Sequence, residues 1–327
     1  MVFRLIGPAV LALHLGTASP KAAFEIRGEV LPHRVASVSL HAIASPFAVS
    51  TVAGPDGHFR FKQVESGTYT LAVATQLGSE VRKTVEIGAA TADKKGRVTV
   101  GINLDGEGSN QAGAAVSARS LRISERAQRE YEQALSRIAR RDFEGALACL
   151  HRTVEIAPEF STAWNQLGTM AYQTQRYRDA ENYFRKGVHA DPDAYEPLVN
   201  LGGVLLNLKN FEEALKYNSE AVRRRPQDAL AQSQLGMTYA LLNQLDRAEK
   251  HLLLSIRLDP DHFSRPQLTL TEVYIRKNQP GRAAEVLEGF LRSHPDWPSA
   301  AKMEQSIAQL RSRIGQVSDA SAAEQRK

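Results

Sequence analysis

Cysteine is almost absent from this 327-residue chain, which has only Cys149. An internal disulfide needs two cysteines, so a disulfide framework, a C-x-x-C redox pair and a zinc site built on several cysteines are excluded. After the first residues, no apolar run reaches the roughly 20 residues that a membrane-spanning helix needs. The 41 basic and 36 acidic residues leave a net charge of +5, too small an excess for this length to indicate nucleic-acid binding.

Catalytic motifs are missing as well. The sequence has no H-E-x-x-H, no G-x-S-x-G, no Walker-type phosphate loop and no G-x-G-x-x-G after a strand. The nine histidines are scattered without the pairing of metal ligands. Cys149 has no identifiable base near it, so we interpret it as a buried side chain and not as a nucleophile. We expect no enzyme activity, metal or cofactor, and an enzyme with an unfamiliar site is the minor alternative.

Residues 1–18 have the layout of a secretory signal. Arg4 gives a positive start, an apolar segment follows, and Gly16 and Ala18 are small residues before a cleavage point after Ala18. This layout predicts an exported protein, periplasmic or secreted, with no transmembrane span after cleavage. The alternatives are an apolar first strand of the next domain and a wrongly assigned start.

Seven short runs of alternating apolar and polar residues occupy residues 24–105 and predict β-strands. Their limits are Phe24–Val30, Val35–Ile43, Phe47–Val52, His58–Lys62, Thr68–Gln76, Glu80–Ile87 and Arg97–Leu104. The stretch Gly54-Pro55-Asp56-Gly57 is a strong hairpin signal. Seven short strands without helical spacing predict an all-β antiparallel sandwich of the immunoglobulin or transthyretin type.

Two motifs in this region carry a family resemblance. Residues 56–61 have the sequence D-G-H-F-R-F and residues 67–73 have the sequence G-T-Y-T-L-A-V. The segment resembles the carboxypeptidase-regulatory-like domain, a transthyretin-like sandwich, although the prolines usual before the glycine are absent. The resemblance implies a non-catalytic accessory module, and we expect Phe59 and Phe61 in its core. Residues 106–118, rich in glycine, alanine and serine, predict a flexible linker, so we expect the flanking domains not to be rigidly fixed to each other.

The second half of the chain repeats every 34 residues. Proline marks the period at Pro158, Pro192, Pro226 and Pro260. Twelve residues before each proline stands an alanine, namely Ala146, Ala180, Ala214 and Ala248. Twenty-four residues before it stands another small residue, namely Ala134, Gly168, Gly202 and Gly236. A 34-residue period with paired helices resembles the tetratricopeptide repeat (TPR) family.

The resemblance predicts a multidomain protein in which an all-α TPR solenoid of about five helix pairs follows the sandwich. The array is expected over 119–314, with repeats at 127–160, 161–194, 195–228, 229–262 and 264–297. A capping helix is expected at 298–314 and a disordered tail at 315–327. One repeat cannot bury its own apolar face, so stacking supplies the core.

In the TPR family the first helix of each repeat lines a concave groove, and the resemblance implies candidate binding residues there. They are Asn165, Gln166, Thr169, Tyr172, Gln173, Val199, Asn200, Gly203, Leu206, Asn207, Ser233, Gln234, Met237 and Leu241. The amides of Gln166, Asn200 and Gln234 share one column and suit hydrogen bonding to the backbone of an extended peptide. The alternative is a solvated polar helix face without a ligand.

These features predict an exported, non-enzymatic interaction scaffold whose groove binds a peptide segment or a helix of a protein partner. The alternative is a cell-wall or carbohydrate-binding adaptor that acts through the sandwich. The arginines at 223–225 end a helix, where they complement its dipole. With those at 137, 140 and 141 they would instead form a patch for an acidic partner. Nucleic acid is not expected as a partner of an exported protein.

Overall fold

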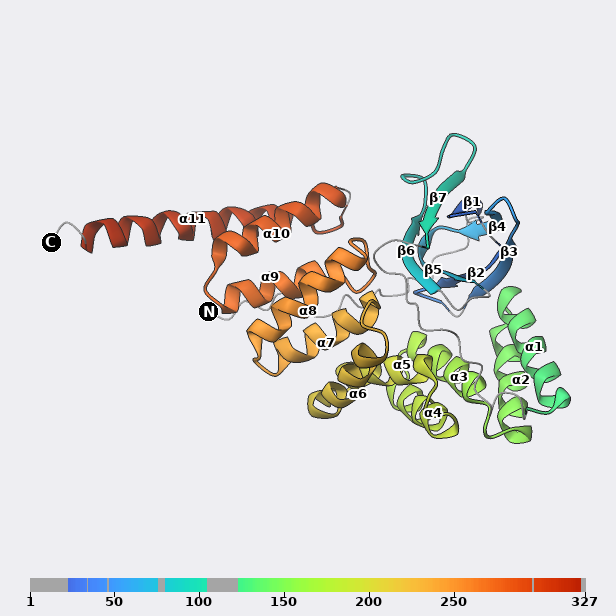
Figure 1. Ribbon diagram of the computed structural model, residues 1–327. Helices are drawn as coiled ribbons and strands as arrows, with labels where there is room; N and C mark the ends of the chain where they lie inside the picture. Colours follow the sequence, from blue (N-terminus) through green and yellow to red (C-terminus); the bar gives the residue numbers. More distant parts are fainter. Residues whose placement is uncertain are drawn as a thin grey trace.

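The computed structural model describes residues 23–33, 35–45, 47–75, 80–104, 123–295 and 297–324. The signal predicted at 1–18 and the linker predicted at 106–118 lie outside the described residues. The described chain forms seven strands followed by eleven helices, and the helical array curves beneath the β-domain (Figure 1).

The seven strands overlap the seven predicted runs. They are β1 (Ala23–Leu31), β2 (Ala36–Ala42), β3 (Ala48–Ala53), β4 (His58–Glu65), β5 (Gly67–Thr75), β6 (Glu80–Ile87) and β7 (Arg97–Asn103). One sheet has the order β4-β1-β7 and the other β3-β2-β5-β6. The predicted antiparallel arrangement is confirmed except between β1 and β7, which pair in parallel. A parallel pair needs a crossover connection, and the five strands between β1 and β7 supply it.

Alternating residues of the strands form the core between the two sheets. In β5, Leu71 and Val73 are fully buried, as the alternation of that strand predicts. Phe59 and Phe61 are both buried, with their ring centroids 6.0 Å apart, so their expected core position is confirmed. The turn at 54–57 also forms, with the Gly57 N–H donating to the Gly54 carbonyl at 2.9 Å. It connects strands of different sheets and therefore turns a corner of the sandwich instead of closing a hairpin.

The helices form five pairs and a final single helix, as predicted. They are α1 (Glu125–Ala139), α2 (Phe143–Ile156), α3 (Ser161–Gln173), α4 (Tyr177–Ala190), α5 (Tyr195–Asn207), α6 (Phe211–Arg224), α7 (Ala229–Leu241), α8 (Leu245–Leu258), α9 (Pro266–Arg276), α10 (Pro280–Ser293) and α11 (Ala300–Glu324). The final helix was expected at 298–314 but continues to Glu324. Helical backbone therefore covers residues 315–324, which the sequence assigned to a disordered tail.

The repeat prolines stand where the second helix of a pair ends. Pro158, Pro192, Pro226 and Pro260 each directly follow the C-cap residue of α2, α4, α6 or α8. Proline lacks the N–H that would continue the helix, so it fixes this boundary in each repeat. The odd-numbered helices also contact one another along the array, α3 with α5, α5 with α7 and α7 with α9. We call the face that these helices share the inner face.

Candidate protein-binding groove

The predicted groove residues lie on α3, α5 and α7, three helices of the inner face. Two hydrogen bonds join neighbouring repeats between residues 35 positions apart. The Asn200 Nδ2 donates to Asn165 Oδ1 at 2.9 Å, and the Asn207 Nδ2 donates to the Tyr172 hydroxyl at 3.0 Å. These two bonds hold the first helices of neighbouring repeats, α3 and α5, against each other.

Apolar side chains remain accessible toward the C-terminal ends of these helices. Tyr172 is 38% exposed and Leu241 is 46% exposed, whereas Leu206 and Met237 are half-buried. We call these four residues the apolar strip. Partial burial raises the pKa of the Tyr172 hydroxyl, which is therefore neutral and accepts the bond from Asn207. Exposed apolar side chains bordered by polar ones are typical of surfaces that bind other proteins.

The amides of the predicted column have different environments. Asn200 bonds to Asn165 inside the array, so its N–H₂ group is already engaged. Gln234 lies over Gly203, where an added Cβ would come within 2.5 Å of the Gln234 Nε2. The Gln234 Oε1 is buried and has no hydrogen-bond partner among the described residues. Gln166 is half-buried on α3. The column is thus present, but its three amides are not equally available to a ligand.

Two predicted groove residues are buried inside the array. Val199 is 1% exposed and packs with Leu198 and Ala231 between α5 and α7. Ser233 has no exposed surface, and its Oγ lies 2.6 Å from Ser264 Oγ. Their side chains hold neighbouring repeats together and offer a ligand no surface. The family pattern places both positions toward the groove, but tight packing of adjacent repeats covers them here.

Among the described residues, the β-sandwich touches the array at two places. In the first, which we call the turn contact, Gln173 Nε2 donates to the carbonyl oxygens of Ala42 at 3.2 Å and Ser45 at 2.8 Å. Arg141, in the turn between α1 and α2, pairs with Glu65 at 3.2 Å, and its guanidinium lies 4.9 Å from the centre of the Phe47 ring. A predicted groove amide therefore binds the backbone of this chain's own β2–β3 turn.

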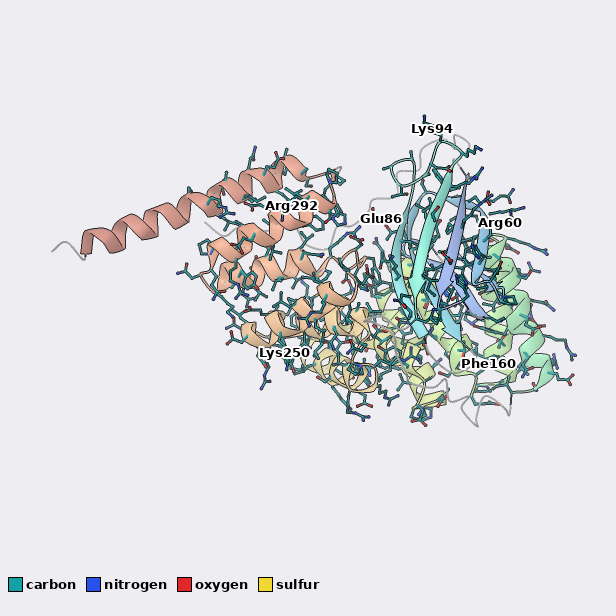
Figure 2. All side chains as sticks on the ribbon, turned by 45° about the horizontal axis from the view of Figure 1, so that its top comes forward. Arg60, Glu86, Lys94, Phe160, Lys250 and Arg292 are labelled. Carbon is teal, nitrogen blue, oxygen red and sulfur yellow. The ribbon has the colours of Figure 1, made fainter. Side chains whose placement is uncertain are left out.

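The second place, which we call the edge contact, joins β6 to the other side of the inner face. Glu196 of α5 lies 2.9 Å from Arg82 and 3.4 Å from Arg225, so its carboxylate bridges both guanidinium groups. Figure 2 labels Glu86 on the side of the sandwich that faces the C-terminal repeats, and its carboxylate lies 2.5 Å from Arg265.

Between these ion pairs the backbone of β6 is itself bound. The Thr84 N–H donates to the Asp259 carboxylate at 3.1 Å, and both residues are buried. Burial raises the pKa of Asp259. Since β6 is an edge strand, the array here covers N–H groups that an isolated sheet would leave open.

The basic patch considered from the sequence is largely paired within the array. Arg223 and Arg224 both donate to Glu220, and the two guanidinium groups lower the pKa of that carboxyl to about 2. Arg225 is held by Glu196, and Arg137 by Asp142. Cys149 is buried, with Arg152 Nη2 3.1 Å from its Sγ. These contacts support structural roles for the side chains involved.

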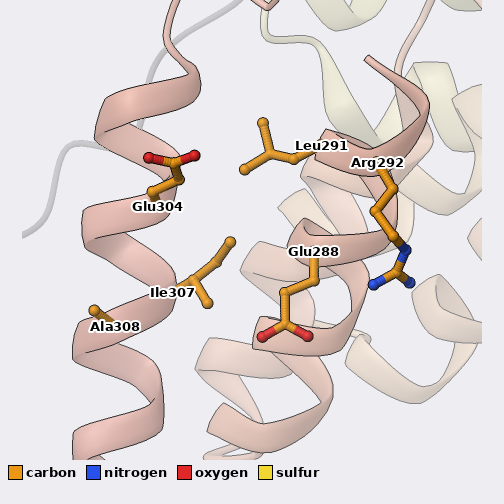
Figure 3. A pocket seen from close by; sticks show the side chains of 6 residues that line it. All are labelled: Glu288, Leu291, Arg292, Glu304, Ile307 and Ala308. Atoms are coloured by element: carbon orange, nitrogen blue, oxygen red, sulfur yellow. The ribbon is translucent and has the colours of Figure 1, made fainter. Parts of the chain in front are cut away.

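A separate crevice of about 490 Å³ lies between α10 and α11. Leu291, Ile307 and Ala308 contribute apolar surface, and Glu288, Arg292 and Glu304 contribute charged side chains (Figure 3). No predicted groove residue borders it. Within the described ranges, we find no cluster of three or more potential metal-ligating side chains and no helix long and apolar enough to cross a membrane.

Sequence reasoning missed three residues that hold the sandwich on the array, namely Glu196, Asp259 and Arg265, and it assigned Arg141 only to a possible patch for an acidic partner. The partners in the edge contact are separated by 114 to 179 positions. A repeat period reports contacts between neighbouring repeats only, so no signal in the sequence indicates these pairs.

Comparison with known proteins supports the repeat assignment. Three overlapping segments, 131–195, 166–229 and 199–263, match the family described as tetratricopeptide repeat. The human cell division cycle protein 16 homolog is 31% identical over 163 residues, which cover 46% of this chain and 25% of that protein. The Hsp70-Hsp90 organising protein of Plasmodium falciparum is 28% identical over 99 residues, covering 30% of this chain and 39% of that protein. The chain thus spans well under half the length of either relative.

Among solved structures, YrrB is described as a TPR protein with an unusual peptide-binding site. It is 25% identical, with a TM-score of 0.48, and the match covers 58% of this chain and all of YrrB. MamA from Desulfovibrio magneticus RS-1 is 24% identical, with a TM-score of 0.48, and the match covers 54% of this chain and 99% of MamA. The helices that follow the β-domain form a solenoid of paired helices, and residues 131–263 of it match the tetratricopeptide repeat.

Proposed function

We propose that this protein is an exported, non-enzymatic interaction scaffold whose inner face binds an extended segment or a helix of a protein partner. Stacked repeats create extended concave surfaces that bind other proteins. The observation that carries the proposal is the composition of that face. The buried acceptors of Gln173 and Gln234 lack a hydrogen-bond donor among the described residues, and the apolar strip beside them is accessible.

A protein segment supplies what this face lacks. Backbone N–H groups would donate to the amide oxygens of Gln173 and Gln234 once the groups that cover these oxygens move aside, whatever the side chains of the ligand are. Apolar side chains of the same segment would cover Tyr172 and Leu241, which are the most exposed members of the strip. The amides would then hold the backbone, and the strip would select for apolar side chains.

The β-sandwich fits an accessory role in this proposal, as the resemblance to the carboxypeptidase-regulatory-like domain implies. The adaptor alternative requires a surface for a sugar ring on the sandwich. Phe59 and Phe61, the aromatic residues of the motif that carries the resemblance, are buried and offer no such surface. We therefore favour a protein partner over a cell-envelope polymer.

The groove is tested with a phage-displayed library of random dodecapeptides selected on the whole protein. We expect Leu241→Asp to weaken binding of the selected peptides at least tenfold, because a carboxylate would interrupt the apolar strip. Leu253→Asp is the matched control, since Leu253 has a similar exposure of 39% but lies on the even-numbered helix α8. Equal losses for the two variants, measured by isothermal titration calorimetry, would exclude the strip as the binding surface.

The amides are tested by the same measurement on the double variant Asn200→Ala and Gln234→Ala. We expect weaker binding of the selected peptides with the helical circular dichroism unchanged. Unchanged affinity would remove these amides from the proposal.

Export is tested separately by N-terminal sequencing of the protein recovered from outside the cytoplasm. The proposal expects a chain that begins after Ala18. A recovered chain that still begins at Met1 would contradict cleavage at the predicted point.

A further inference from the structure

The turn contact and the edge contact together place the sandwich across the inner face. The turn contact involves Arg141 and Gln173, in the first two repeats. The edge contact runs from Glu196 of α5 to Arg265 at the start of α9. The sandwich thus reaches from the first helix pair to the last, along the face where the candidate groove residues lie.

These contacts recognise backbone as well as side chains. Gln173 binds two carbonyl groups of the β2–β3 turn, and Asp259 binds a backbone N–H of β6. Beside the two carbonyls, Phe47 lies under the Arg141 guanidinium, which also pairs with Glu65. The inner face therefore binds two backbone carbonyls, an adjacent aromatic ring and a carboxylate. A segment of another protein could present the same three groups.

The contacts between the sandwich and the array are also of a kind that allows the two domains to separate. Three of them are ion pairs, and two of these use Glu86 and Glu196, which are each about two-fifths exposed, so solvent screens the attraction. The apolar contribution that we identify is small, from Ala48 against the core of the first repeat and from Phe47. Domain interfaces of this polar composition resemble transient protein–protein interfaces.

We propose that the sandwich is a built-in ligand of the inner face, and that a partner segment gains Gln173 and Arg141 only when it displaces the β2–β3 turn. The competing segment would offer two free backbone carbonyls beside an aromatic side chain. The role of the partner rests on the proposed function, whereas the docking of the sandwich does not. If the docked state is populated nine-tenths of the time, it weakens the apparent affinity of a competing segment about tenfold.

Hydrogen exchange of the full chain tests the docking directly through the Thr84 amide. Its N–H points away from the sheet to Asp259, so docking alone protects it. The double variant Arg82→Ala and Arg265→Ala removes both ion pairs of the edge contact and leaves Gln173 and Arg141 intact. We expect exchange at Thr84 to become at least tenfold faster in this variant. The Lys83 amide, on the residue paired with Leu71 of β5, serves as the internal reference and should stay protected.

The matched control is Arg27→Ala with Arg311→Ala, which removes two arginines that pair within one domain, with Glu25 and Glu288. It should leave exchange at Thr84 unchanged. A Thr84 amide that exchanges in the unmodified chain as fast as in an unstructured peptide would overturn the docking. So would equal acceleration in the control and in the edge variant.

Competition is tested with a cyclised synthetic hairpin of residues 38–52, which carries both carbonyls and Phe47. We expect it to bind the edge variant more tightly than the unmodified chain, by up to about tenfold if the docked state is populated nine-tenths of the time. Equal affinity for the two proteins would overturn the role of the sandwich as a competitor, even with Thr84 protected. Neither the exchange nor the hairpin experiment uses peptides from the library. If the library peptides fail to bind the groove, the exchange result still tests the docking, so the two failures can be told apart.

Discussion

Small residues determine how closely the two helices of a repeat approach. An added Cβ would lie 1.9 Å from Asn218 Oδ1 at Gly202, 2.4 Å from the Phe184 ring at Gly168 and 2.7 Å from the Leu252 side chain at Gly236. These glycines recur every 34 residues, and so do the side chains they face. Because these glycines have no Cβ, a bulky or polar side chain of the second helix can pack directly against the backbone of the first helix.

We predict that Gly202→Ala lowers the free energy of unfolding by about 1–3 kcal/mol, because the methyl group overpacks a filled contact. Gly289→Ala is the control, since its nearest neighbour would be an Arg292 nitrogen at 3.8 Å. That variant should gain up to about 1 kcal/mol from the better helix propensity of alanine. Thermal unfolding followed by helical circular dichroism measures both. The prediction fails if the two substitutions shift the midpoint in the same direction.

His262 makes the array sensitive to acid. It is 5% exposed, and its Nδ1 lies 2.7 Å from Ser264 Oγ. Burial lowers the pKa of His262 to about 3, whereas the unfolded chain has a histidine pKa near its ordinary value of about 6.5. Between these two pH values the unfolded chain binds a proton that the folded protein does not. Stability contributed by the neutral ring is therefore full above pH 6.5 and is lost as the pH falls toward 3.

From this difference we predict a loss of about 2 kcal/mol in the free energy of unfolding between pH 7 and pH 5. Urea titrations at several pH values measure it. His262→Gln should make this loss distinctly smaller, and His189→Gln, at an exposed position of α4, should leave it in place. An identical pH dependence in all three proteins would contradict the assignment to His262.

At the scale of single elements, the turn inside each repeat has one residue in the left-handed region. The positions are Arg141, Gln175, Lys209, Asn243 and Asn278, with φ between 56° and 62°. Asparagine adopts this conformation more readily than other side chains, because its short amide bonds locally to the backbone. Asparagine occupies this position only in the last two turns. In the other three turns the packing of the helices on either side imposes the left-handed backbone on a less suited residue.

We predict that Lys209→Val lowers the free energy of unfolding by about 1–2 kcal/mol, since a β-branched residue is strained at positive φ. Lys209→Asn removes the same charge and should leave stability within about 0.5 kcal/mol. Chemical denaturation of both variants separates strain from loss of charge. Equal destabilisation would mean that the lysine side chain, and not the backbone, matters at this turn.

At the scale of the whole molecule, the relation between the two domains depends on charge. Arg82 with Glu196 and Arg265 with Glu86 join β6 to the array, and each pair has a partly exposed carboxylate. Salt shortens the range of such interactions to about 3 Å at 1 M. The cores of the sandwich and of the repeats are apolar and do not depend on this attraction.

We therefore predict that raising sodium chloride from 0.05 M to 1 M increases the radius of gyration without unfolding either domain. Small-angle X-ray scattering measures the change, and circular dichroism of the same samples verifies the helical content. Superimposable scattering curves at the two salt concentrations would contradict an interface that depends on its ion pairs.

The sequence by itself determined the elements and their order. Strand alternation located all seven strands, and the 34-residue recurrence of proline and of small residues located four of the five helix pairs, because both patterns arise between residues close in the chain. It also assigned fourteen candidate groove residues to three inner helices. It did not foresee that Val199 and Ser233 are covered, since the spacing of neighbouring repeats depends on side-chain volumes in both.

Only the tertiary structure decided the parallel pairing of β1 with β7 and the docking of the sandwich on the array. Thr84 and Asp259 are 175 positions apart, and no sequence motif predicts that they are in contact. The linker composition predicted domains that are not rigidly fixed to each other, and it gave no sign that an edge strand would pack against a carboxylate of the array. A periodic sequence specifies contacts that repeat, whereas a contact made once between two domains depends on the complementary shape and charge that only the folded surfaces present.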